Sequence, residues 1–275
     1  MIVRSPKFDF SQTTPHWAPN HEFAHMFNGM SMLFPPLERF LNRVMATARG
    51  KITGKDAKSV QVRADIAMFI RQEGVHYSIH TAFNDMLERH GYPDLPKFEA
   101  EMEEFYRELL RTKSLKQQLA FCEGFEILGP IYAHIWLDEI GDLFEGGDPD
   151  AVAMWKWHIA EEFEHRTVCF DTYNLLYGGY LTRLNGLKEA GRAHTAYVKR
   201  VMNYMLARDW ATMSEAEVAA SKARLAAVEK RIKRLAMRRI WRVFVPFYSP
   251  RQAVLPSNYD ATLGAIERRY VANPA

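Results

Sequence analysis

Two segments of the chain carry a glutamate followed three residues later by a histidine. The first is Glu73-x-x-His76 in RQEGVHYSIH, and the second is Glu162-x-x-His165 in WHIAEEFEHRT. In a helix, residues three positions apart project from the same face. Each pair therefore presents a carboxylate beside an imidazole, a donor set that suits iron, manganese or zinc.

A single glutamate precedes each of these segments: Glu38 in PPLERF and Glu123 in FCEGF. The resulting order, Glu, Glu-x-x-His, Glu, Glu-x-x-His, matches the dimetal site in the core of ferritin-like carboxylate bundles. Four buried carboxylates would repel one another, and two divalent cations would balance their charge. We therefore expect two divalent metal ions, with iron favoured and manganese or zinc as alternatives. The predicted metal ligands are Glu38, Glu73, His76, Glu123, Glu162 and His165.

Neighbouring residues leave some of these assignments open. The alternatives are Glu161 for Glu162, Glu126 for Glu123, and Glu22 for Glu38. Two further histidines lie seven residues from a predicted ligand on the same helix faces: His80 follows Glu73, and His158 precedes His165. They could be extra ligands, partners of the ligands, proton relays or hydrogen-bonded core residues. We predict His80, His158 and Glu161 as catalytic residues.

Long helices are required to place these side chains together. Helical spacing and the positions of Gly, Pro and capping residues predict an all-α fold, a ferritin-like four-helix bundle with additional C-terminal helices. The predicted helices cover 35–48, 56–89, 97–140, 149–177, 182–209 and 214–243, with a bend near 112–114 and another at 129–130. The predicted organisation is an irregular segment (1–34), the dimetal bundle (35–180), helices packing on it (181–250) and an extended tail (251–275).

Composition excludes several other classes of protein. The 275 residues include only 15 Gly and 13 Pro, which argues against a turn-rich β protein. Two cysteines, Cys122 and Cys169, exclude a disulfide-stapled scaffold, and we expect both to be small core residues. The chain begins without a signal-peptide pattern and has no apolar stretch of about 18 residues, so a cytoplasmic location is expected.

Positive charge is concentrated late in the chain. Residues 222–242 contain nine basic residues and one acidic residue, although the whole chain has a net charge of only +3. Apolar positions at helical spacing from Leu225 and the following IWRVFVPFY predict either a helix that packs on the bundle or a peripheral membrane contact through 222–250. Only the charge favours nucleic acid, so none is expected as a partner. Long amphipathic helices make a homodimer reasonable.

At the quoted motifs the sequence resembles a bacterial family described as predicted metal-dependent hydrolases, within the ferritin-like, dimetal-carboxylate class. The matching segments are FPPLERF (34–40), FIRQEGVHYSIHTAFN (69–84), the Glu123 region and WKWHIAEEFEHRTVCFDTYN (155–174). The resemblance implies the same metal ligands and marks His80 and His158 as matching positions.

The expected chemistry depends on the metal. Our main prediction is a non-haem di-iron oxidoreductase that activates O2 for an apolar small-molecule substrate and receives electrons from a donor protein. The alternative is a dimetal-dependent hydrolase, in which metal-bound hydroxide attacks an ester, amide or phosphoester. A third hypothesis is a non-catalytic metal-binding helical protein.

Overall fold

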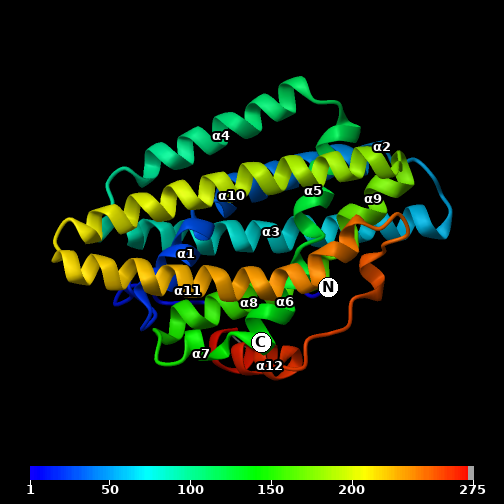
Figure 1. Cartoon of the computed structure of the whole chain (residues 1–275). Coiled ribbons are helices and arrows are strands. Elements are labelled where there is room, and N and C mark those ends of the chain that lie inside the picture. The colour runs from blue at the N-terminus through cyan, green and yellow to red at the C-terminus, as the bar shows by residue number, and fades with distance from the viewer. Residues whose placement is uncertain (272–275) are drawn as a thin grey trace.

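The computed structural model describes residues 1–271, and every regular element in that range is helical. The prediction of an all-α fold is confirmed, and the long helices form a bundle (Figure 1). The elements are α1 (His21–Ser31), α2 (Phe34–Lys51), α3 (Ala57–Arg89), α4 (Leu95–Thr112), α5 (Leu115–Glu126), α6 (Gly129–His134), the π-helix η1 (Ile135–Glu139), α7 (Gly141–Phe144), α8 (Pro149–His165), α9 (Val168–Leu176), α10 (Tyr180–Trp210), α11 (Glu215–Ile240), the 3-10 helices η2 (Trp241–Phe244) and η3 (Pro250–Gln252), and α12 (Tyr259–Tyr270).

Three of the four helices that carry the predicted ligands begin at side-chain caps, whereas α2, which carries Glu38, has prolines in its first turn instead. The Asp56 carboxylate accepts the Ser59 amide N–H at the start of α3, and Ser114 forms a reciprocal capping box with Gln117 at the start of α5. Asp148 caps α8 by accepting two backbone N–H groups. These caps fix where each helix begins, and therefore which residues reach the centre of the bundle.

Two of the predicted helices are interrupted. The stretch 97–140 is divided at both expected bends, giving α4, α5 and α6. The stretch 149–177, predicted as one helix, is divided into α8 and α9. The guanidinium of Arg166 donates to the carbonyl of Phe163 at 2.8 Å, so a side chain satisfies one of the last carbonyls of α8.

Both ends of the chain contain helices that the sequence pattern did not indicate. The segment expected to be irregular contains α1, where Asn20 accepts the Phe23 amide N–H and Phe23 and Phe27 are buried. The tail expected to be extended contains α12, which packs on α8 through Leu263 and Ile266. The last four residues of that predicted tail lie outside the described residues. Both helices are short, and tertiary burial stabilises them more than helical periodicity does.

Helices α10 and α11 run antiparallel to each other along the bundle, as Figure 1 shows in yellow and orange. Helix α10 packs closely on α5 because glycine faces the contact from both sides. A Cβ at Gly124 would lie 2.5 Å from the Cα of Leu187, and one at Gly186 would lie 2.1 Å from the carbonyl oxygen of Ala120. This close approach fixes the position of α5, which carries two of the candidate glutamates.

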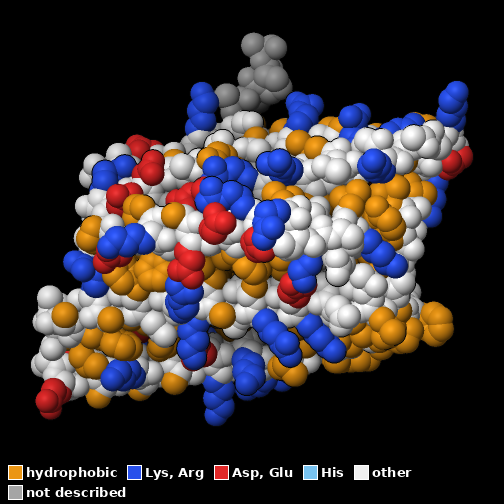
Figure 2. Space-filling model, turned by 90° about the horizontal axis from the view of Figure 1, so that it is seen from above, with side chains coloured by type: hydrophobic (Ala, Val, Ile, Leu, Met, Phe, Trp, Pro, Cys, Tyr) orange, Lys and Arg blue, Asp and Glu red, His pale blue; other side chains and the backbone are white. Residues whose placement is uncertain are grey.

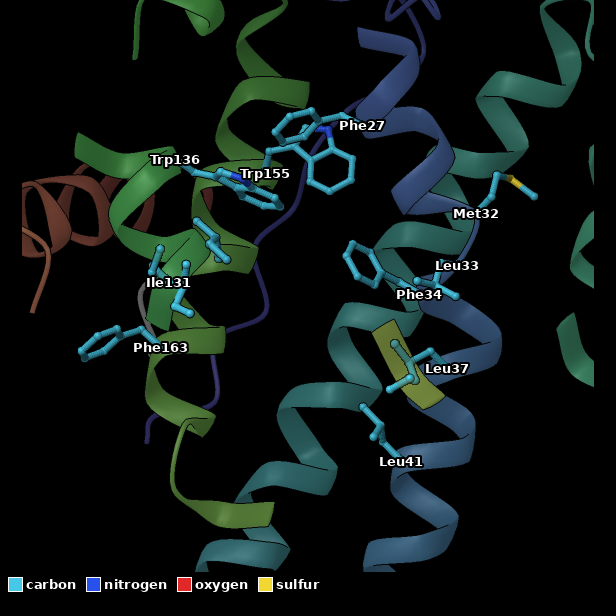
Figure 3. Close-up of a cluster of buried hydrophobic side chains, with 14 of the residues drawn as sticks. Phe27, Met32, Leu33, Phe34, Leu37, Leu41, Ile131, Trp136, Trp155 and Phe163 are labelled. Carbon is cyan, nitrogen blue, oxygen red and sulfur yellow. The ribbon is translucent and has the colours of Figure 1, made fainter. Parts of the chain in front are cut away.

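Aromatic side chains fill the space between the N-terminal helices and α8. Phe34 and Trp155 point toward each other from α2 and α8, with ring centroids 6.0 Å apart, and Phe27 packs against Trp136 and Trp155 (Figure 3). These rings are buried. They exclude water from one side of the predicted site, which strengthens electrostatic interactions inside it.

Candidate metal centre

Four carboxylates and three imidazoles converge in the core of the bundle. Helices α2, α3, α5 and α8 contribute them, and none of the seven side chains belongs to a residue more than 4% exposed. They are Glu38, Glu73, His76, Glu126, His158, Glu162 and His165. A cluster of this charge, buried to this degree, requires compensation by cations or protons.

The seven side chains form two adjoining groups. Ligand atoms of Glu73, Glu126, Glu162 and His165 all lie within 4.8 Å of one another, and so do those of Glu38, His76 and His158. The Oε1 atom of Glu162 lies between the groups. It is 3.5 Å from His76 Nδ1, 3.5 Å from His158 Nε2 and 3.8 Å from His165 Nδ1. This carboxylate is therefore placed to contact both candidate metal positions.

Most of the inward-facing atoms have no hydrogen-bond partner among residues 1–271. Both carboxylate oxygens of Glu38, Glu73 and Glu126, together with Nδ1 of His76 and His165, are buried without a hydrogen bond. Nδ1 of His165 lies 2.8 Å from Oε1 of Glu73, within ion-pair distance. An unsatisfied buried polar group costs about 1–3 kcal/mol, and a charged one costs more. So many buried ligand atoms aimed at one place fit bound metal ions.

Two of the histidines are held from behind by hydrogen bonds that fix their tautomers. His76 donates from Nε2 to the carboxylate of Glu161 at 3.2 Å, and His165 donates from Nε2 to Oε1 of Gln72 at 3.2 Å. Burial opposes protonation of both imidazoles, but neighbouring carboxylates outweigh it and raise the pKa of each, so the metal-free protein favours a proton on Nδ1 as well. When a metal replaces that proton, the neutral ring keeps its Nε2 proton and offers the lone pair of Nδ1. In both rings Nδ1 is the nitrogen that faces the carboxylates, as a metal ligand requires.

The tautomer of His158 follows from a longer chain of hydrogen bonds. The amide N–H of Asn84 donates to the backbone carbonyl of Ser31 at 3.1 Å, so Asn84 Oδ1 must accept from the Ser31 hydroxyl at 2.6 Å. Ser31 Oγ then accepts from Nδ1 of His80 at 2.9 Å, and Nε2 of His80 accepts from Nδ1 of His158 at 3.1 Å. The lone pair on His158 Nε2 is left facing Glu162.

Charge interactions within the cluster shift several pKa values in opposite directions. Burial raises the pKa of Glu38 and of Glu126, and neighbouring carboxylates, Glu73 for the first and Glu162 for the second, raise each further. Burial also opposes ionisation of Glu73, but His165 and His76 outweigh it and lower the pKa of that carboxyl to about 2. The protein alone therefore disfavours full ionisation of the cluster, whereas divalent cations would favour it.

Glu123, predicted as a ligand, does not reach this cluster. Its Oε1 atom lies 3.5 Å from the guanidinium of Arg183 on α10, and Glu126 takes the place in the cluster that we assigned to it. Burial raises the pKa of Glu123 to about 7, although Arg183 opposes the shift. Glu22, the alternative to Glu38, is also elsewhere and pairs with Arg224 at 2.7 Å.

Two of the predicted catalytic residues lie behind the ligands. His80 contacts His158 and Ser31, and Glu161 contacts His76 and the buried Arg4 at 3.0 Å. Neither lines the cavity described below. These positions suit residues that orient ligands, whereas His158 is itself among the candidate ligands.

A separate group of His16, His25 and Asp209 has the composition of a metal site but is satisfied by hydrogen bonds. Both Nε2 atoms lie on Asp209 Oδ2, at 2.6 and 2.7 Å. The indole N–H of Trp17 donates to Asn28 Oδ1, so the Asn28 amide N–H faces Nδ1 of His25. The His25 proton is therefore on Nε2 and donates to Asp209, which leaves no lone pair there for a metal.

An apolar cavity of about 310 Å³ reaches the candidate metal centre. Its walls come mainly from α1, α5, α8, α10 and α11, and His158 and Glu162 lie at its inner surface. Most of the lining is aromatic, aliphatic or methionine, including Met30, Phe125 and Trp136. The arrangement gives an apolar molecule access to two of the candidate ligands.

Several residues of the site were not found by sequence reasoning. Arg4 contacts Glu161, and Gln72 contacts His165, although each pair is far apart in the sequence. His194 on α10 lines the cavity and is hydrogen-bonded to the Tyr106 hydroxyl at 2.9 Å. Burial lowers the pKa of His194 to about 3, so this imidazole is neutral near pH 7. The sequence of α10 contains many polar residues, and no motif distinguishes His194 from them.

Both cysteines are buried, and burial raises the pKa of each thiol. Cys169 contacts the sulfur of Met45 at 3.7 Å. The interpretation of these residues as small core side chains agrees with these contacts.

The fold and this cluster define a class of protein: a helical bundle whose core holds buried carboxylates and imidazoles arranged as a metal-binding site would require. The chain belongs to the predicted metal-dependent hydrolase family, whose model matches residues 2–253. The resemblance noted at the motifs is thus confirmed over most of the chain. No curated protein and no solved structure gives a significant match.

The family assignment overturns our main functional prediction. The matching family is described as predicted metal-dependent hydrolases, which contradicts our prediction of a di-iron oxidoreductase. The oxidoreductase prediction relied on the carboxylate and histidine donor set in an apolar bundle and on the mid-helix position of the ligands. Such donors also suit metals that do not change oxidation state. The hydrolase that we held as the alternative has the better support.

Proposed function

We propose that the protein is a dimetal-dependent hydrolase that cleaves an ester or amide whose apolar part occupies the cavity. The observation that carries this proposal is the position of His158 and Glu162, which belong both to the metal cluster and to the cavity wall. Family membership supports the reaction class. The apolar lining supports the substrate class.

The two groups of candidate ligands would hold two divalent cations. Cations in such a site polarise a carbonyl oxygen and make bound water more acidic. The chain's own residues perform the other tasks. Glu161 and Gln72 orient the imidazoles, and the aromatic side chains that line the cavity exclude bulk water from the bond to be cleaved.

The cavity wall favours a carboxylic ester or amide over a phosphoester. Its only basic side chain other than histidine is Lys199, and Glu229 and Glu162 are acidic. Phosphoryl groups are usually bound by several arginines or lysines. A neutral acyl group needs no such charge, and its hydrocarbon part gains from contact with the apolar wall.

The test is hydrolysis of p-nitrophenyl esters of increasing acyl length by protein loaded separately with zinc, manganese and ferrous ion. We expect activity that depends on added metal, persists with zinc and falls when Glu73→Ala or Glu162→Ala removes a ligand. Circular dichroism of each variant checks that the helices remain. Equal hydrolysis by metal-loaded wild type and by both variants would contradict the proposal.

A further inference from the structure

Exposed hydrophobic side chains are concentrated where α10 begins and α11 ends. Among residues 1–271, nine of the eleven exposed large hydrophobic residues lie in 177–181 and 237–255. Phe247 is 92% exposed and Trp241 is 57% exposed. Single exposed apolar residues are ordinary, but a concentration of aromatic ones marks a contact surface.

The two stretches form one surface because they are bonded to each other. The hydroxyl of Tyr180 donates to the carbonyl of Phe244, and the guanidinium of Arg183 donates to the carbonyl of Val243 at 2.9 Å. We call this surface the apolar corner. Its members are Tyr177, Leu181, Met237, Trp241, Phe244, Val245 and Phe247. Hydrophobic side chains gather at one corner of the molecule in Figure 2, beside a row of basic ones.

Basic side chains surround the apolar corner on the outer face of α11. We call them the basic face: Lys230, Lys233, Arg234 and Arg238 on α11 and Arg242 on η2, all exposed. Within residues 1–271 none of the five has an ion-pair partner within 4.0 Å, whereas Arg231 and Arg239 pair with Asp142 and Glu139. Positions 230, 234, 238 and 241 recur at helical spacing, so the basic face leads directly to Trp241.

The fold itself does not need this face. The side of α11 that packs on the bundle uses Val228 and Leu235, which are buried, and Ile232, which lines the cavity. The basic residues of α11 are exposed and take no part in these contacts. Burial in the bundle, the simpler of the two interpretations of 222–250, therefore accounts for one side of the helix only.

We propose that the apolar corner and the basic face dock the protein on an anionic lipid bilayer. Aromatic side chains insert at the level of the headgroups, and lysine and arginine are attracted to acidic lipids. None of the helices in the described part of the chain is both long and apolar enough to cross a membrane, so the contact is peripheral. A nucleic-acid duplex would use the cations through its phosphates but leave the apolar corner without a role.

Docking also places the cavity close to the bilayer, because α11 contributes Glu229 and Ile232 to its wall. The docking proposal does not depend on the proposed reaction, and binding alone tests it. A protein that binds vesicles but hydrolyses no ester would retain the docking surface and lose only the proposed function.

The experiment is co-sedimentation of the full chain with vesicles of phosphatidylcholine containing roughly one third phosphatidylglycerol. We expect pelleting at low salt that weakens as salt increases, and little pelleting with phosphatidylcholine alone. Arg234→Gln/Arg238→Gln should lower the binding constant at least tenfold, since each basic residue near such a surface contributes roughly fivefold. The matched control is Arg107→Gln/Arg111→Gln on α4, which removes the same charge and should bind like wild type.

The apolar corner is tested separately by Trp241→Ser/Phe247→Ser, with the exposed Val60→Ser as control. We expect roughly tenfold weaker pelleting for the double variant and none of this loss for the control. Failure of wild type to pellet, or equal pelleting of both double variants and wild type, would overturn the proposal. A dimer in the absence of lipid that Trp241→Ser/Phe247→Ser dissociates would assign the surface to a second copy instead.

Discussion

The imidazole of His76 is held between two carboxylates with different tasks. Its Nε2 lies 3.2 Å from Oε2 of Glu161, and its Nδ1 lies 3.5 Å from Oε1 of Glu162 on the same turn of α8. Adjacent residues of one helix thus meet opposite sides of one ring. Glu161 fixes the orientation of the ring, and Glu162 shares the position where a metal would bind.

This relationship predicts the effect of Glu161→Ala. Removing the acceptor for the Nε2 proton lets the His76 ring reorient, and loss of such an outer partner typically weakens metal binding about 10–100-fold. Competition against a chelator of known affinity measures the change. Glu161→Gln keeps an oxygen acceptor, so we expect it to recover part of the affinity.

The control for this prediction is Glu267→Ala. Glu267 accepts from the same Arg4 as Glu161 does, at 2.6 Å, but touches no candidate ligand. The Glu267→Ala variant should bind metal with the affinity of wild type. Equal losses in Glu267→Ala and Glu161→Ala would show that disturbing Arg4 is responsible and that His76 is not oriented by Glu161.

Glu126→Gln should change metal binding and metal-free stability in opposite directions. Loss of a ligand should weaken metal binding at least tenfold. In metal-free protein the pKa of Glu126 is raised by burial and by Glu162. The unfolded chain loses this proton above about pH 4.5 while the folded protein retains it, so the free energy of unfolding falls as pH rises. Removing this carboxyl group should increase the free energy of unfolding at pH 8 by roughly 1–3 kcal/mol, measured by urea denaturation.

Glu123→Gln is the matched comparison, three residues away on the same helix. Because Glu123 faces Arg183, this substitution should leave metal affinity within about twofold of wild type. A loss of affinity in Glu123→Gln together with normal binding in Glu126→Gln would restore the ligand assignment that the sequence predicted.

The choice between these two glutamates shows what the sequence could provide. Helical spacing predicted that both Glu-x-x-His pairs lie on helices, and the structure places them on α3 and α8. Glu123 and Glu126 are three residues apart on one helix, so periodicity alone could not separate them. The deciding partner is Arg183, sixty residues further along the chain. In the same way, the tautomer of His158 depends on Ser31 and Asn84, which no local motif connects to it.

Gly191→Leu should block the cavity without disturbing the fold. A Cβ at Gly191 would meet no atom within 4 Å, and this residue lines the cavity from the middle of α10. Leucine is also a better helix former than glycine by up to about 1 kcal/mol. If the proposed reaction is correct, KM should rise about tenfold or more for long acyl esters and change little for acetate esters.

Metal content separates blocking from damage in this variant. Gly191→Leu should bind as much metal per chain as wild type, because no candidate ligand contacts position 191. Gly74→Leu on α3, where a Cβ also meets no atom within 4 Å, is the matched substitution outside the cavity. An unchanged KM for long esters in Gly191→Leu would show that the cavity does not bind the acyl part.

His194 predicts a defined loss of stability in mildly acidic solution. Burial lowers its pKa from 6.5 to about 3, so the folded protein keeps this imidazole neutral while the unfolded chain binds a proton as pH falls below 6.5. The stabilisation is complete above pH 6.5 and is lost progressively toward pH 3. Between pH 6.5 and pH 5 the loss should be about 1–2 kcal/mol, because each pKa unit corresponds to about 1.4 kcal/mol.

Urea denaturation of wild type and His194→Gln at both pH values measures this loss of stability. The loss common to both proteins reports other groups, including the metal ligands, and the difference between them reports His194. If the two proteins lose stability equally over this interval, His194 is protonated in the folded state or is not buried as described.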